Sequence, residues 1–148
     1  LLNNNGSTPV DSFHRELGSV MIDRCGISRH ADGLREGLKQ VKALEQRFEA
    51  EVRVPGDACG PNAELEKALR VKDFFGLAQL MLRDALAREE SCGAHFREEH
   101  QSEDGEARRD DVNFAHIAAW EHNSGGEPTR HSEPLQFTAL QPSTRSYK

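Results

Sequence analysis

The sequence has few cysteines, and none of them forms a short paired motif. Cys25, Cys59 and Cys92 are far apart and odd in number. An odd number without a CxxC pair argues against a disulfide framework and against a zinc site. We therefore expect no bound metal in this chain and a reducing compartment.

The glycine-rich motifs that hold nucleotide phosphates are also missing. Neither GxGxxG nor GxxxxGK[ST] occurs in the 148 residues, and these motifs supply the usual backbone cradle for dinucleotides and nucleotides. Local spacing also suggests no nucleophile–base pair. We expect this chain by itself to contain no catalytic and no cofactor-binding residue.

Long apolar runs and basic stripes are absent as well. No run approaches the roughly 20 apolar residues that span a bilayer, so we expect no direct membrane insertion. The net charge is −6, and residues 88–111 hold nine acidic against four basic side chains. Because neutralisation of phosphates supplies most of the affinity for nucleic acid, we expect no nucleic-acid partner.

What the sequence does contain is helical periodicity in three stretches, at about 12–25, 32–52 and 62–90. The length is sufficient for one domain with its own core. Mostly apolar residues recur at helical spacing: Phe13, Leu17, Val20 and Met21, then Leu34, Leu38, Val41, Leu44 or Glu45, and Phe48, then Leu65, Leu69, Phe74, Leu77 or Ala78, Met81, Ala85 and Leu86. This spacing predicts a three-helix antiparallel bundle over 11–90.

Several residues mark the predicted ends of these helices. Candidate N-caps, which share a short polar side chain, are Asp11 or Ser12, Asp32 and Asn62. Gly26 is suited to a left-handed turn that ends the first helix. Gly76 costs the third helix about 1 kcal/mol relative to alanine, so a kink there is possible.

The two ends of the chain are less regular. Residues 1–10 are rich in Asn, Gly, Ser and Pro and are typical of a linker from a missing upstream domain. Residues 91–148 are predicted to be loop-rich and to pack on the bundle and on that missing domain. Within them, 112–120 is apolar enough for a short helix or strand, and Trp120 is expected to anchor this region to the bundle.

A short strand is expected near the end, because Leu135, Phe137 and Ala139 alternate with polar residues. The predicted fold class is therefore mainly α: a three-helix antiparallel bundle followed by an irregular, partly extended C-terminal segment with a short strand.

One string, His95-Phe96-Arg97-Glu98-Glu99-His100, looks superficially like a metalloprotease motif. It lacks a glutamate directly after the first histidine, and its second histidine is in the wrong place for either arrangement of that motif. We interpret residues 91–111 as a polar segment that gains order through hydrogen bonds and ion pairs with another domain.

Ordered matches along the chain resemble one family. Residues 83–97, Arg-Asp-Ala-Leu-Ala-Arg-Glu-Glu-Ser-Cys-Gly-Ala-His-Phe-Arg, resemble the segment "R-x-E-S-R-G-A-H-x-R" of succinate dehydrogenase, fumarate reductase and L-aspartate oxidase flavoproteins. Residues 108–114 are similar to the "R-D-D-x-N-W" that follows it, and 142–148 to the "R-x-Y" ending. The resemblance covers 10–148, with Cys92 where many members have Arg and Phe114 where many have Trp.

The resemblance implies a structural C-terminal domain of a subunit that interconverts succinate and fumarate. It places FAD, the substrate-binding groups and the proton donor in an upstream flavin-binding domain. It also implies electron transfer to an iron–sulfur subunit and quinone, and a cytoplasmic location at the inner face of a bacterial membrane through partner subunits. This chain alone is expected to be inactive.

The resemblance also suggests which residues contact the upstream domain. Suited to charge-assisted interdomain bonds are Arg88, Glu89, His95, Arg97, Arg109, Asp110 and Asp111. Two alternatives stay open: the corresponding domain of L-aspartate oxidase, and a stand-alone helical interaction module. The polar 98–111 segment and the Thr-Arg-Ser-Tyr-Lys end favour the dehydrogenase.

Overall fold

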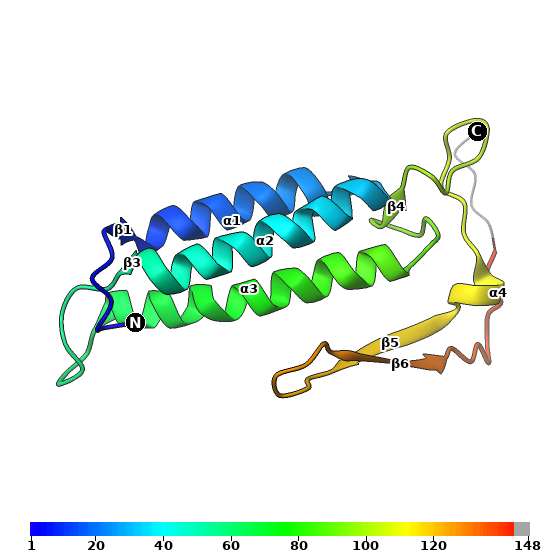
Figure 1. Cartoon of the computed structure of the whole chain (residues 1–148). Coiled ribbons are helices and arrows are strands. Elements are labelled where there is room, and N and C mark those ends of the chain that lie inside the picture. Colours follow the sequence, from blue (N-terminus) through cyan, green and yellow to red (C-terminus); the bar gives the residue numbers. More distant parts are fainter. Residues whose placement is uncertain (144–148) are drawn as a thin grey trace.

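Three long antiparallel helices dominate the computed structural model, which describes residues 1–143 (Figure 1). They are α1 (Val10–Cys25), α2 (Ala31–Glu51) and α3 (Ala63–Ala87). Short connections turn the chain back after each helix, so neighbouring helices run in opposite directions. The predicted fold class, mainly α with an extended C-terminal segment, is confirmed. No helix among these residues is both long and apolar enough to cross a bilayer.

One aromatic side chain from each helix meets at the centre of the bundle. The ring of Phe48 lies 5.3 Å from that of Phe13 and 5.4 Å from that of Phe75, and all three are fully buried. The predicted stripes of α1 and α2 are confirmed, since Leu17 and Leu34 are also buried and the other members are at least partly buried. Such close packing makes these positions sensitive to changes in volume.

The buried face of α3 differs from the predicted one. Its buried residues follow a regular 3–4 spacing: Ala68, Val71, Phe75, Ala78, Leu82 and Ala85. Leu69 and Met81 were predicted in the core but are about half exposed. Of the two alternatives Leu77 and Ala78, Ala78 is the buried one, and Leu77 is exposed. Large apolar residues lie on more than one face of α3. The spacing of apolar residues therefore did not identify the buried face, on which small alanines pack against the other helices.

Short parallel strand pairs close both ends of the bundle. At one end β1 (Thr8–Pro9) pairs with β3 (Val52–Arg53), and at the other β2 (Ser28–Arg29) pairs with β4 (Phe96–Arg97). Part of the predicted linker is thus docked on the bundle. Gly6 permits this, because a Cβ there would lie 2.1 Å from the carbonyl oxygen of Glu51.

The helix starts agree only in part with the predicted caps. Asn62 caps α3, since its Oδ1 accepts a 3.0 Å hydrogen bond from the N–H of Leu65. The predicted cap of α2, Asp32, is wrong: His30 takes that position, and its Nδ1 accepts from the N–H of Gly33 at 3.1 Å. A histidine ring can reach as far as an aspartate carboxylate, but histidine is not among the residues preferred at helix N-caps.

The two ends of α1 are also corrected. It begins at Val10, directly after Pro9 and without a side-chain cap, so Asp11 and Ser12 do not cap it. Gly26 has φ −62°, which is not left-handed; glycine is needed there because a Cβ would lie 2.7 Å from the carbonyl oxygen of Ile22. At Gly76, α3 continues as one uninterrupted helix.

A β-hairpin after the bundle lies along the C-terminal half of α3 (Figure 1). The short α4 (Asp111–Phe114) leads into β5 (His116–Glu121), which pairs with β6 (Thr129–Pro134). The strand predicted from Leu135, Phe137 and Ala139 is wrong, because β6 ends before them. The sequence of β6 is polar on both faces, so no alternation revealed it. Arg145 and Tyr147 of the "R-x-Y" resemblance lie outside the described residues.

Candidate functional site: the junction at the end of the bundle

Arg97 closes the C-terminal end of α3. Its guanidinium Nη1 donates to the carbonyl oxygens of Ala85 (2.9 Å), Leu86 (3.1 Å) and Arg88 (3.3 Å), and the residue is only 2% exposed. The last carbonyls of a helix have no partner within the helix, and a cation there also complements the helix dipole. Arg97 therefore acts as a buried C-terminal cap supplied from another part of the chain.

The strand that carries Arg97 is fixed to the turn between α1 and α2. Phe96 donates its N–H to the carbonyl oxygen of Ile27 (3.1 Å), and Glu98 donates to that of Arg29 (2.9 Å). The hydroxyl of Ser91, which is fully buried, bonds both the N–H and the carbonyl oxygen of Arg97. These bonds bring residues from the ends of α1 and α3 into one cluster.

Glu99 occupies the N-terminal end of α2. Its carboxylate accepts hydrogen bonds from the N–H of Ala31 and from Nε of Arg97 (3.2 Å). Burial alone would raise the pKa of Glu99, but the amide N–H groups of Ala31 and of Glu99 itself, together with the Arg97 guanidinium, lower it to about 2. Glu99 is therefore a carboxylate at neutral pH.

A buried carboxylate joins the end of α3 to α4. Glu90 is 2% exposed, pairs with Nη2 of Arg88 at 2.6 Å and accepts the N–H of Asp110 at 2.8 Å. Arg88 also donates to the carbonyl oxygen of Phe114 (3.0 Å). Asp110 caps α4, and hydrogen bonds from the side chain and backbone of Asn113 lower its pKa.

His95 lies between these groups and is half-buried. Its Nε2 is 2.9 Å from the carbonyl oxygen of Arg88, which can only accept, so Nε2 carries the proton. Burial lowers the pKa of His95; the bond to Arg88 opposes this, and the charges of Arg29, Arg97 and Arg88 add to the lowering. The imidazole is therefore neutral near pH 7.

Three of the seven predicted contact residues, Arg88, His95 and Arg97, thus meet at the end of α3. Arg109 and Asp111 form their own ion pair, 2.5 Å, which raises the pKa of Arg109. Residues 91–111 were expected to gain order through bonds with another domain, and this stays a prediction; the hydrogen bonds described above lie within this chain. The buried Glu90 and Ser91 were missed, since one sequence cannot distinguish a buried glutamate from a solvated one.

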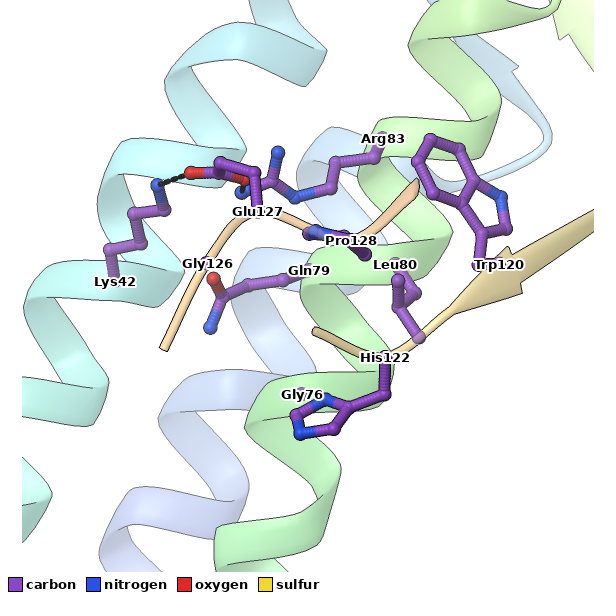
Figure 2. A pocket seen from close by; sticks show the side chains of 10 residues that line it. All are labelled: Lys42, Gly76, Gln79, Leu80, Arg83, Trp120, His122, Gly126, Glu127 and Pro128. Carbon is purple, nitrogen blue, oxygen red and sulfur yellow. Dashed lines mark hydrogen bonds and ion pairs between the residues drawn. The ribbon is translucent and has the colours of Figure 1, made fainter. Parts of the chain in front are cut away.

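The hairpin is attached to the bundle by polar side chains (Figure 2). The carboxylate of Glu127, at the hairpin loop, bridges Lys42 of α2 (3.4 Å) and Arg83 of α3. Trp120 donates from Nε1 to Asp84 at 2.9 Å, which confirms its predicted role as an anchor. The residues around Glu127 and Trp120 line a cleft on the α2 side of the hairpin.

The described residues do not fit a dinucleotide. Helix N-termini are the usual cradle for phosphate, but the N-terminus of α2 is bonded by Glu99 and that of α3 by Asn62. α1 follows Pro9 and not a glycine-rich turn. Within residues 1–143, no three His, Cys, Asp or Glu side chains are grouped to hold a metal ion. The hydrogen bonds of the junction hold the ends of α1, α2 and α3 together.

The fold and the junction define a mainly helical domain whose charged groups at the junction hold its own segments together. A family model described as the C-terminal part of fumarate reductase flavoproteins matches residues 14–147. The chain belongs to this family: it is the C-terminal domain of a succinate dehydrogenase/fumarate reductase flavoprotein.

Individual relatives agree with this assignment. The fumarate reductase flavoprotein subunit of Escherichia coli (strain K12) is 30% identical over 148 residues, which cover 99% of this chain and 24% of the relative. A solved structure described as quinol-fumarate reductase with menaquinol molecules superposes with a TM-score of 0.79 at 27% identity, covering 96% of this chain and 24% of that one. An L-aspartate oxidase of Ralstonia nicotianae is 30% identical over 120 residues, 81% of this chain and 20% of the relative. The chain spans about a quarter of the length of the flavoprotein relatives it matches.

Proposed function

We propose that this chain is the non-catalytic structural domain of a subunit that interconverts succinate and fumarate. The family match over residues 14–147 carries the proposal. FAD and the substrate bind in an upstream flavin-binding domain, and electrons pass through FAD to an iron–sulfur subunit and quinone. The subunit works at the cytoplasmic face of a bacterial membrane, held there by its partners.

Within that subunit the domain braces the flavin-binding domain. The bundle has its own aromatic core, which gives it the rigidity that a brace requires. Glu89 and the Arg109–Asp111 pair lie at the surface beside the junction, where they can bond a neighbouring domain. Exposed pairs of this kind contribute little alone and more once a partner covers them. Arg97 contributes indirectly, by holding the segment that presents these residues.

Activity of matched proteins tests the proposal. The full-length subunit and this 148-residue chain are purified, supplied with FAD, and assayed for succinate-dependent reduction of an artificial electron acceptor. The full-length protein should turn over and retain flavin, while the 148-residue chain should do neither. Succinate-dependent turnover by the chain alone, or its absence from the flavin-loaded full-length protein, would contradict the proposal.

The similarity to an L-aspartate oxidase supports a second candidate. The same full-length protein should then be assayed with L-aspartate in place of succinate. Aspartate-dependent reduction that exceeds succinate-dependent reduction would favour the oxidase. The stand-alone interaction module would be favoured by a start codon at Leu1 and the lack of an upstream flavin-binding region in frame.

A further inference from the structure

An open groove runs along α3 on the side of the hairpin that faces α1. It has a volume of about 480 Å³ and is separate from the cleft around Glu127. Its walls come from the end of α1, the second half of α3 and β5, and its end is completed by Arg29 of β2 and by the segment after α3. Leu80 and Trp120 line both hollows, so the hairpin rests on α3 with one hollow on each side.

The long wall of the groove is apolar and open to solvent. Leu77 and Met81 are 55% and 49% exposed, although they lie on the same helix as the buried Phe75. Ala118 of β5 faces them from the other side. Adjacent apolar side chains left open in a concave surface are typical of a site that another protein segment covers.

One end of the groove carries the guanidinium groups of Arg29 and Arg88, beside the neutral imidazole of His95. Arg88 is neutralised by the buried Glu90 at 2.6 Å. Arg29 forms no ion pair with residues 1–143: its Nη2 is 3.4 Å from the carbonyl oxygen of Ala94, and its Nη1 is 3.8 Å from Sγ of Cys25.

The Nε of Arg29 is buried and has no hydrogen-bond partner. This half-buried guanidinium has only weak partners, and a buried donor without a partner costs free energy. A carboxylate bonded to the guanidinium would recover that free energy. The acidic residue that lines the groove, Asp84, is already bonded by Trp120.

We propose that this groove receives a segment of the flavin-binding domain of the same subunit. The segment places apolar side chains against Leu77 and Met81 and an Asp or Glu carboxylate against Arg29. A planar guanidinium matches a carboxylate with two parallel bonds, which fixes the register of the segment. This inference rests on the proposed function, since it takes its partner from there.

A small dicarboxylate fits the groove less well than a protein segment. Only Arg29 lacks an anionic partner among the lining cations with a permanent charge, so a second carboxylate would face the apolar side chains of Leu77 and Met81. Burial of a charge against apolar groups is unfavourable unless it is paired. A segment with one acidic residue and apolar neighbours satisfies both parts of the groove.

Cysteine labelling in the full-length subunit tests the coverage. In a background with Cys59→Ser and Cys92→Ser, Met81→Cys is compared with Leu69→Cys, which is 50% exposed on the same helix but outside the groove. Native maleimide labelling should be at least about tenfold slower for Met81→Cys, and the two rates should be equal in denaturant. Equal native rates would overturn the proposal.

The carboxylate contact has its own test. Arg29→Gln should restore most of the labelling rate of Met81→Cys, whereas Arg15→Gln, on the exposed surface of α1, should leave it unchanged. A photo-crosslinker attached at the same position should capture a peptide of the flavin-binding domain that contains Asp or Glu. No effect of Arg29→Gln, capture of another copy of the domain, or protection of the 148-residue chain by added succinate would each contradict the proposal.

These outcomes are separate from those that test the proposed function. Succinate-dependent reduction by the same background protein reports on the function alone. An active subunit with equal labelling rates refutes only the groove, while an inactive, flavin-free subunit refutes the function from which the partner was taken.

Discussion

The bundle and the hairpin are parts of one chain that are stabilised by different forces. Within residues 1–143, the buried apolar core lies between Val10 and Ala85, and the hairpin contributes no residue to it. The hairpin is instead held by hydrogen bonds and ion pairs from Trp120 and Glu127. Apolar burial is worth about 25 cal/mol per Å², whereas an exposed ion pair is worth about 0–1 kcal/mol. The bundle should therefore stay folded when the hairpin opens.

The junction at Arg97 is intermediate between the two. Its groups are polar, like those of the hairpin, but Glu90, Ser91 and Arg97 are as buried as the core. Buried polar groups are costly only when a partner is removed. The junction should therefore respond strongly to deletion of one group, and the hairpin weakly.

The largest effect should come from the core. Phe75→Ala should lower the free energy of unfolding by about 3–5 kcal/mol, because it leaves a cavity where the three phenylalanines meet. Leu69→Ala, half exposed on the same helix, should change it by about 0.5 kcal/mol or less. Urea denaturation followed by circular dichroism measures both. If Leu69→Ala lowers the free energy of unfolding as much as Phe75→Ala does, Leu69 belongs to the core, as the sequence predicted.

Removal of the Arg97 cap should have the next largest effect. Arg97→Met keeps much of the volume but leaves the carbonyl oxygens at the end of α3 without their donor, so we expect a loss of about 2–3 kcal/mol. Arg97→Lys keeps the charge and can reach fewer carbonyls, so it should lose less. If Arg97→Met unfolds at the same urea concentration as the unaltered chain, the cap does not stabilise the domain.

Loosening the hairpin should have a smaller and more local effect. Glu127→Gln removes the charge that bridges Lys42 and Arg83, and it should ease opening of the hairpin by about 0.5–1 kcal/mol. Glu121→Gln is the matched control, because among residues 1–143 Glu121 pairs with His131 inside the hairpin and with no residue of the bundle. Amide exchange of β5 and β6 reports the opening. An equal response to both substitutions would mean that the bridge to the bundle is not what holds the hairpin.

The smallest effect on the stability of the domain should appear at acidic pH. Hydrogen bonds hold the pKa of Glu99 at about 2, below its ordinary value of 4.5, so its stabilising contribution is complete above pH 4.5 and is lost as the pH falls towards 2. Relative to Glu99→Gln, the unaltered chain should lose stability in that window and at no higher pH. The effect is modest because Glu99 is 40% exposed.

The lowered pKa of His95 has a separate window. An imidazole that is neutral when folded and protonated when unfolded costs stability as the pH falls below its ordinary value of 6.5. This loss is common to the unaltered chain and to Glu99→Gln, so it cancels in their difference. A difference that instead begins near pH 6.5 would point to His95 and contradict the role of Glu99.

The sequence was informative where one periodic signal dominates. The helices of the bundle and the stripes of α1 and α2 follow from apolar spacing, because each helix has one side facing its partners. In α3 the same rule selected Leu69 and Met81 and left Leu77 or Ala78 open, because it weighs large side chains above small ones such as Ala68. Which face of a helix packs inward depends on how closely the neighbouring helices approach. The spacing of apolar residues in the sequence does not show that distance.

The junction and the hairpin were harder to predict for a related reason. Arg97 donates to backbone carbonyl oxygens eleven or twelve residues away. Because every residue has a backbone carbonyl, the sequence does not show which ones a side chain bonds. The string of residues 83–97 led to the correct family but not to these local roles. In β6 neither face is buried, so the alternation that reveals a strand is missing, and Leu135 and Phe137 were favoured instead.

Hydrogen exchange of the unaltered chain tests the central claim most directly. The hydrogen-bonded amides of β5 and β6 should exchange at least about 100-fold faster, relative to their intrinsic rates, than those in the middle of α2 and α3, because the hairpin opens without unfolding the core. If both sets of amides are equally protected and respond alike to denaturant, hairpin and bundle unfold as one unit, and the account of two differently stabilised parts is contradicted.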